Sequence, residues 1–187
     1  MILYLHGFRS SPASHKAQQM RARLQARGLA EHFVCPALPV SPQAAVALAE
    51  ALIAGSPTPV TLIGSSLGGY YATYLSEKYR LRAALVNPAV VAHLSLSAYL
   101  GEQTNLYTGE RFAFTRMHIA ELQALELPVL QQPGNFWLLV ETGDELLDYR
   151  QAVARYAGGR QTVIDGGDHS FTHWEEYLDE LIDFAGF

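Results

Sequence analysis

Short apolar runs that alternate with longer amphipathic stretches restrict the fold of this sequence more than any other feature. Helices are predicted over about residues 15–27, 42–54, 67–79, 148–157 and 173–185. The apolar runs are predicted as strands, at about residues 2–6, 32–36, 60–63, 83–87, 136–141 and 160–165. Strands separated by helices form βαβ units, which build parallel sheets covered on both faces. We therefore predict an α/β fold with about six mostly parallel strands.

The order of the strands decides which loops meet. If the strand at residues 32–36 lies on one side of the first strand and the strand at residues 60–63 lies on its other side, the order becomes 2-1-3-4-5-6. The loops after the first and third strands then meet at the reversal point, where open α/β sheets bind ligands. These two loops begin near His6 and Gly64.

One segment, residues 88–134, interrupts the alternation and is too long for an ordinary connection. It is predicted to hold two short helices, at about residues 92–100 and 115–125. We expect a single domain over residues 1–187, with residues 88–134 as a cap or insertion within it. The aromatic residues of this cap either line a binding site or pack over the sheet: Tyr99, Tyr107, Phe112 and Phe114.

Charge and composition exclude several classes of function. The chain has 13 basic and 18 acidic residues, and only two of the basic residues are lysines. Binding to nucleic acid is therefore not expected. The single Cys35 excludes an intrachain disulfide. No apolar run approaches the ~20 residues that span a bilayer, and no signal peptide is evident. We expect a soluble cytoplasmic protein without a membrane partner, and no metal site or cofactor.

The motif Gly64-x-Ser66-x-Gly68 lies between a predicted strand and a predicted helix. A sharp turn at this place lifts the serine hydroxyl above the edge of the sheet, and the flanking glycines leave room for it. The following helix directs its N-terminal N–H groups to the same point. We therefore predict that Ser66 is a nucleophile.

A serine nucleophile needs a base that a third group orients, and in this type of fold the chain order is Ser, acid, His. Asp144 follows the fifth predicted strand, and His169 lies in a glycine-rich loop after the sixth. We predict that they are the acid and the base. His173 is the alternative base, and Asp148 and Glu145 compete with Asp144.

An acyl-transfer site also needs N–H donors for the oxyanion. The backbone N–H of Leu67, which follows the nucleophile, is one candidate. The other is the N–H of Phe8, because Gly7 lets the loop after the first strand turn toward the site. We expect His6 to fix this loop by hydrogen bonding. Arg9, Arg111 and Arg116 could each meet an acidic group of a substrate or lie in solvent.

These motifs together resemble the α/β-hydrolase superfamily. More narrowly, His6-Gly7-Phe8-x-Ser10-Ser11-Pro12-x-Ser14-x-Lys16-Ala17, Asn87-Pro88-Ala89-Val90, Tyr107-Thr108-Gly109 and Asp148-Tyr149-Arg150-Gln151-Ala152 resemble the small bacterial YqiA-type esterases. The resemblance covers essentially the whole chain. It implies a minimal α/β-hydrolase fold, hydrolysis of carboxylic esters or thioesters, and a triad on Ser66, Asp144 and His169.

The leading hypothesis is a serine esterase that acts on a small acyl ester or thioester through an acyl-enzyme. The alternatives are a non-catalytic ligand-binding protein on the same scaffold, or an acyltransferase or small-peptide hydrolase with the same triad. The short cap favours a compact esterase with a shallow, open site.

Overall fold

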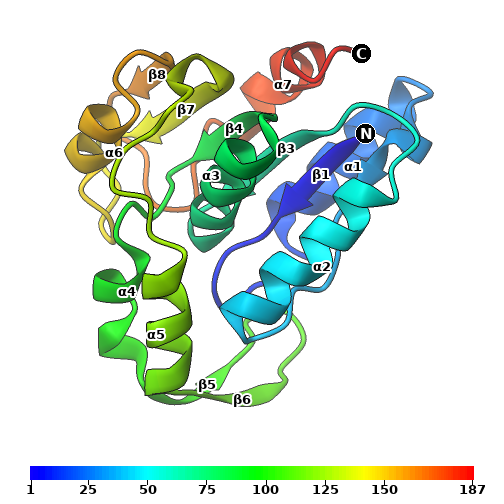
Figure 1. The fold of residues 1–187 in the computed structure, drawn as a ribbon. Coiled ribbons are helices and arrows are strands. Elements are labelled where there is room, and N and C mark those ends of the chain that lie inside the picture. The colour runs from blue at the N-terminus through cyan, green and yellow to red at the C-terminus, as the bar shows by residue number, and fades with distance from the viewer.

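A six-stranded parallel sheet is the central layer of the computed structural model, which describes residues 1–187 (Figure 1). The order is β2-β1-β3-β4-β7-β8, and every neighbouring pair is parallel. This order is the predicted one, since β7 and β8 are the fifth and sixth strands of this sheet. The strands are β1 (Ile2–Leu5), β2 (Phe33–Val34), β3 (Thr61–Ser65), β4 (Arg82–Val86), β7 (Phe136–Glu141) and β8 (Arg160–Ile164).

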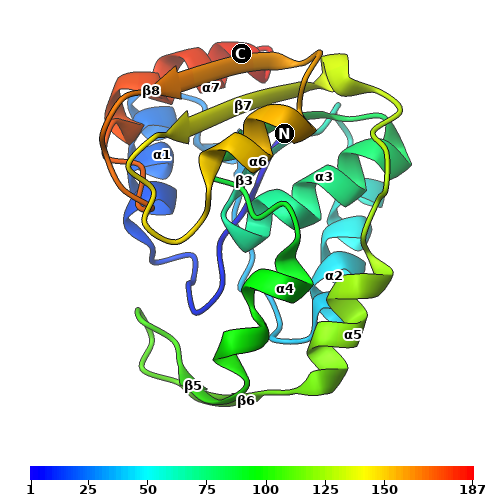
Figure 2. The same cartoon turned by 90° about the vertical axis from the view of Figure 1, so that its left-hand side faces the viewer.

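Helices cover both faces of this sheet, as the βαβ pattern predicts (Figure 2). No helix combines the length and the apolar character that a membrane span requires. One face carries α2 (Pro42–Ala54), α3 (Leu67–Tyr79) and α6 (Tyr149–Arg155), and the other carries α1 (His15–Ala26) and α7 (Leu178–Phe184).

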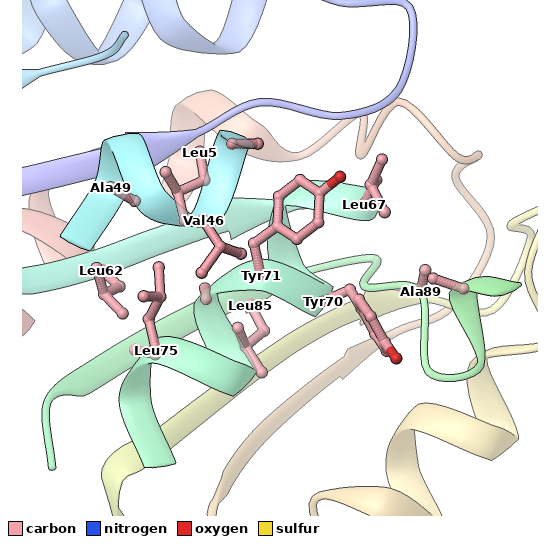
Figure 3. Packing of buried hydrophobic residues seen from close by; sticks show 14 of the residues in the cluster. Leu5, Val46, Ala49, Leu62, Leu67, Tyr70, Tyr71, Leu75, Leu85 and Ala89 are labelled. Carbon is pink, nitrogen blue, oxygen red and sulfur yellow. The ribbon is translucent and has the colours of Figure 1, made fainter. Parts of the chain in front are cut away.

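Two hydrophobic clusters, one on each face, follow from the alternation of side chains along the strands. Leu3 and Leu5 pack with α2, α3 and α6, whereas Ile2 and Tyr4 pack with α1 and α7. Figure 3 shows the first cluster, in which Tyr71 of α3 is buried with side chains of α2 and of the sheet. Because β1 is buried on both faces, its carboxyl end and the loop that follows it are firmly placed.

Helix caps account for some of the element boundaries. Ser41 caps α2 by accepting a hydrogen bond from the N–H of Ala44, and Pro42 occupies the first helical position. Ser14 lies at the corresponding position of α1, but its hydroxyl makes no capping hydrogen bond. The predicted final helix, about residues 173–185, begins instead as a 3₁₀ helix, η4 (Trp174–Tyr177), and continues as α7.

The segment between β4 and β7 holds the main difference from the predicted elements. The helix expected at about residues 92–100 is shorter, α4 (Ala92–Ser95), followed by a 3₁₀ turn, η2 (Ser97–Tyr99), while α5 (Arg116–Ala124) agrees with the prediction. An antiparallel hairpin of β5 (Gly101–Thr104) and β6 (Arg111–Phe114) was not predicted. Its strands are mostly exposed, so they lack the apolar runs that identify buried strands.

Candidate active site

The turn between β3 and α3 places Ser66 in a strained backbone conformation. Its φ of 55° and ψ of −119° are unusual for a residue with a side chain, and such strain is typical of functional positions. The flanking glycines are required by close packing, because a Cβ on Gly68 would overlap the Leu5 carbonyl and one on Gly64 would overlap Gly68. The motif therefore forms the predicted sharp turn.

The structure brings Ser66, Asp144 and His169 together from three different loops. The Nε2 atom of His169 lies 3.0 Å from the Ser66 hydroxyl, and its Nδ1 lies 2.8 Å and 3.0 Å from the two Asp144 carboxylate oxygens. An ionised carboxylate can only accept hydrogen bonds, so Nδ1–H donates to Asp144. In the neutral imidazole, Nε2 is then free to accept the proton of the Ser66 hydroxyl.

Asp144 is held rigidly by the turn that it begins. Its side chain is 2% exposed, and its Oδ1 accepts hydrogen bonds from the N–H groups of Leu146 and Leu147, each at 2.9 Å. These contacts aim the Oδ2 atom at the imidazole.

The competing acids and base have other partners. Asp148 caps α6 by accepting from the N–H of Arg150, and Glu145 accepts from the backbone N–H of His169 at 2.9 Å. His173 is paired with the buried Glu141 at 2.7 Å rather than with Ser66.

The backbone N–H groups of Phe8 and Leu67, beside Ser66, have no acceptor in the protein. The loop after β1 approaches the serine closely, since a Cβ on Gly7 would lie 3.2 Å from the Ser66 Cβ. Leu67 is the first residue of α3, where N–H groups have no intrahelical partner. Both N–H groups are thus available to a bound oxyanion.

The loop after β1 is fixed from two directions. His6 is 5% exposed; its Nε2 accepts from the N–H of Leu38 at 3.1 Å, so its Nδ1–H can donate to the carbonyl of Gly7. Burial lowers the pKa of His6, which favours this neutral form. The Phe8 ring packs edge-on against cap aromatics, with the Phe114 centroid 4.9 Å away. His6 therefore fixes the loop, as expected, and the segment between β4 and β7 supports it.

The candidate arginines and the aromatic residues of the segment between β4 and β7 differ in whether they lie near Ser66. Arg9 lies beside Ser66, but its Nε donates to the carbonyl of Thr104 at 3.1 Å and ties the hairpin to the loop. Arg111 is exposed and faces Glu102, and Arg116 is exposed on α5, so neither lies at the site. Tyr99 lines a cavity beside Ser66, Tyr107 lines a second, and Phe112 and Phe114 pack against Phe8.

Two residues for which no role was predicted, Glu141 and Asn87, hold the loop that carries His169. The Asn87 side chain donates to the carbonyl oxygens of Asp168 and His169, at 3.0 Å and 3.3 Å, and accepts from the N–H of Glu141. The Glu141 carboxylate, which is not exposed to solvent, accepts from the N–H groups of Asp168, Thr172 and His173. The signal in the sequence is weak: each is a polar residue at the end of an apolar strand.

The environment of Glu141 keeps it ionised. Burial alone would raise its pKa, but the hydrogen bonds from the His173 ring and from the three backbone N–H groups outweigh burial and hold the pKa below its usual value. The same pairing raises the pKa of His173, because its hydrogen bond to Glu141 favours the protonated ring.

We expect Glu141→Gln to lower the free energy of unfolding by about 3 kcal/mol at neutral pH, because an amide cannot accept all the hydrogen bonds that the buried carboxylate accepts. Since the folded-state pKa is lowered, this stabilisation is present above about pH 4.5 and is lost as the pH falls through the lowered pKa. Urea denaturation over a pH series measures it, with the exposed Glu110→Gln as control. A difference that stays constant into acid would contradict this assignment.

Two cavities lie beside Ser66. The smaller, about 280 Å³, is lined mainly by apolar side chains, among them Leu67, Leu96, Tyr99, Leu146 and Leu147. The larger, about 730 Å³, is lined mainly by polar residues. Both include Phe8, Ser66, Leu106 and His169 in their walls.

Comparison with known proteins gives one family and one fold. The model of the uncharacterised protein family UPF0227 matches residues 1–186. The mouse alpha/beta hydrolase domain-containing protein 10 is 18% identical with a TM-score of 0.74, over 97% of this chain and 89% of that one. A monoacylglycerol lipase from Paleococcus ferrophilus is 15% identical with a TM-score of 0.71, over 98% of this chain and 93% of that one. An esterase domain from Rhodothermus marinus is 18% identical with a TM-score of 0.69, over 98% of this chain and 85% of that one.

Proposed function

From the premise that this chain belongs to the family UPF0227 and has the α/β-hydrolase fold, we propose that it is a serine hydrolase that cleaves carboxylic esters or thioesters of small or short-chain acyl groups. One observation carries the proposal: a continuous hydrogen-bonded chain from the Ser66 hydroxyl through the His169 ring to the buried Asp144. The names of two structural neighbours, an esterase domain and a monoacylglycerol lipase, support it.

The first half-reaction forms an acyl-enzyme. The Ser66 hydroxyl transfers its proton to Nε2 of His169 while its oxygen attacks the acyl carbon, and Asp144 stabilises the imidazolium that results. The N–H groups of Phe8 and Leu67 bind the oxyanion, and each such donor contributes about 3–4 kcal/mol in other acyl-transfer enzymes. The bond to the leaving oxygen or sulfur then breaks, and that atom takes the proton from Nε2.

The second half-reaction releases the acid. A water molecule gives a proton to Nε2 and its oxygen attacks the acyl carbon, again with the oxyanion at Phe8 and Leu67. The bond to the Ser66 oxygen breaks, the serine takes back the proton, and the carboxylic acid leaves. The same steps serve an ester and a thioester, so the two are distinguished only by measurement.

The smaller cavity is suited to the acyl group. Its walls are mainly apolar, and it includes Leu67, whose N–H is the proposed oxyanion donor. Its volume of about 280 Å³ limits the chain that it can bury. Filling it with methylene groups is favourable until the cavity is full, which favours short chains over long ones.

A profile of acyl-chain length, with oxygen and sulfur esters measured side by side, tests this proposal. We expect kcat/KM to rise about fourfold per added methylene from acetyl to hexanoyl esters, since each buried methylene contributes about 0.8 kcal/mol. It should fall for dodecanoyl esters. Leu146→Ser removes part of the apolar wall and should lower kcat/KM for hexanoyl esters about tenfold, with little effect on acetyl esters.

Leu94→Ser is the matched control, because Leu94 is an exposed leucine of the cap that does not line the cavity. Its chain-length profile should match that of the unmodified protein. Saturable binding of these esters without turnover would contradict the proposed activity and favour a ligand-binding protein.

A further inference from the structure

The larger cavity beside Ser66 contains a lysine that has no carboxylate partner. Lys16 lies in the first turn of α1, lines this cavity, and donates one hydrogen bond, 2.6 Å long, to the carbonyl oxygen of Ser170. It forms no ion pair, whereas the other lysine of the chain, Lys78, is paired with Glu50 at 2.7 Å. The Lys16 ammonium therefore keeps N–H donors for a group that enters the cavity.

The surroundings of Lys16 leave it charged at neutral pH. Burial lowers its pKa to about 8, and the negative charges of Asp168, Glu141 and Asp144 oppose that shift without contacting the ammonium. A partly buried charge with no counter-ion is unfavourable, and a ligand that supplies an anion relieves that cost.

A second observation at the same place points to an anion. Ser14 precedes α1 and lines the same cavity; it is 6% exposed, and its hydroxyl has no hydrogen-bond partner. The backbone N–H groups of His15 and Lys16 also have no acceptor in the protein. Unpaired N–H groups at a helix N-terminus favour a negative charge, and here a hydroxyl and an ammonium accompany them.

The acidic side chains that line this cavity are directed to other partners. Glu145 accepts from the N–H of His169, and Glu175 accepts from the side chain of Gln19. The charge of Glu176 acts on His173, whose pKa it helps to raise. None of the three is paired with Lys16.

The larger cavity lies on the side where the leaving group must depart. His169 delivers a proton to the leaving atom, so that atom lies next to the His169 loop. Residues 169–172 all line the larger cavity, whereas His169 is the only one of them that lines the smaller. Leu67, on the acyl side, lines the smaller cavity but not the larger.

We propose that the substrate carries an anionic group, a carboxylate or a phosphate, on its leaving group, and that Lys16 binds this anion together with the first turn of α1. The inference rests on the proposed hydrolase function, since it assigns the leaving group of that reaction. It makes the substrate an ester or thioester of a short apolar acid with an anionic alcohol or thiol.

The test compares three butyryl esters that differ only in one substituent of a phenyl leaving group: 3-carboxyphenyl, 3-phosphonophenyl and the neutral 3-carbamoylphenyl. We expect at least one anionic ester to exceed the neutral one about tenfold in kcat/KM, since a charge-assisted hydrogen bond supplies that much. The preferred anion distinguishes carboxylate from phosphate. Lys16→Met should abolish the preference, so that the three esters reach about the same kcat/KM, and Lys16→Arg should retain it.

Lys78→Met is the matched control, because it removes the only other lysine and lies outside both cavities. Equal loss for all three esters in Lys16→Met would overturn the proposal and give Lys16 a structural role at Ser170. If Lys16→Met does not fold, the unmodified protein still decides: no preference for either anionic ester means that the proposal is wrong.

A binding measurement separates this proposal from the proposed activity. Calorimetry on Ser66→Ala should show that 3-hydroxybenzoate or 3-hydroxyphenylphosphonate binds more tightly than 3-hydroxybenzamide, and that a second change, Lys16→Met, removes the difference. Lys16-dependent binding without hydrolysis of any ester would support the anion site and contradict the hydrolase. Hydrolysis of the esters with equal binding of all three ligands would support the hydrolase and contradict the anion site.

Discussion

Ser66→Ala is expected to lower kcat for ester hydrolysis by about 10⁶-fold, the loss seen when a triad serine is removed from another hydrolase. The reason is that the hydroxyl is the only nucleophile within hydrogen-bonding distance of Nε2 of His169. A fluorophosphonate probe, which reacts with activated serines, should label the unmodified protein and not the variant. Steady-state kinetics with a butyryl ester measures the same loss independently.

The sequence supplies a neighbouring serine as the control. Ser65 precedes Ser66 in the same motif, but it ends β3 and makes no hydrogen bond to His169. Ser65→Ala should still be labelled. Equal labelling of Ser66→Ala and the unmodified protein would show that the nucleophile is elsewhere.

Asp144→Asn is expected to lower kcat by about 10⁴-fold, because it stabilises the wrong tautomer of His169. The structure shows how: the Oδ1 position already accepts two backbone N–H groups, so the asparagine oxygen must remain there. The amide NH₂ then occupies the Oδ2 position, 2.8 Å from Nδ1, and donates to it. The ring proton moves to Nε2, which can no longer accept the proton of Ser66.

Asp148→Asn is the matched control, four residues away on the same loop. Its carboxylate caps α6 and pairs with the exposed Arg150 at 3.3 Å. Asparagine is an equally good capping residue and an exposed ion pair contributes little, so both activity and stability should change little. Kinetics and thermal unfolding of the two variants compare them directly. A larger loss of activity in Asp148→Asn would move the acid from Asp144 to Asp148.

Much of the fold is predictable because it depends on local patterns. The parallel pairing of the strands follows from the βαβ alternation, and the observed order is the one expected if the chain reverses direction after its second strand. The strand predicted at residues 136–141 is observed there as β7. The hairpin of β5 and β6 was missed because its strands are only four residues long and mostly exposed, and β5 carries no apolar side chain. It lies against the loop of Phe8 through contacts between residues more than ninety positions apart, which no local pattern reports.

Some residues of the candidate site are likewise identifiable from local sequence patterns, and others are not. Ser66 is identifiable because a strained turn needs glycines at fixed spacing, and Gly64 and Gly68 lie two residues before and after it in the sequence. His169 and Asp144 are identifiable by their places after the last two strands. Glu141 and Asn87 are not, because their partners in the loop of His169 are 27 to 82 residues distant along the chain.

The sequence by itself determined the parallel sheet, the turn at Ser66 and the candidates for the acid and the base, since each depends on the period of apolar residues or on spacing within a loop. Only the tertiary structure separated the predicted base and acid from their alternatives, by bringing His169 to Ser66 and Asp144 to His169, and placed Lys16 in the wall of the polar cavity beside Ser66. The physical reason is that distances and burial at the sheet edge are set by how several loops pack together, and no single segment contains that information.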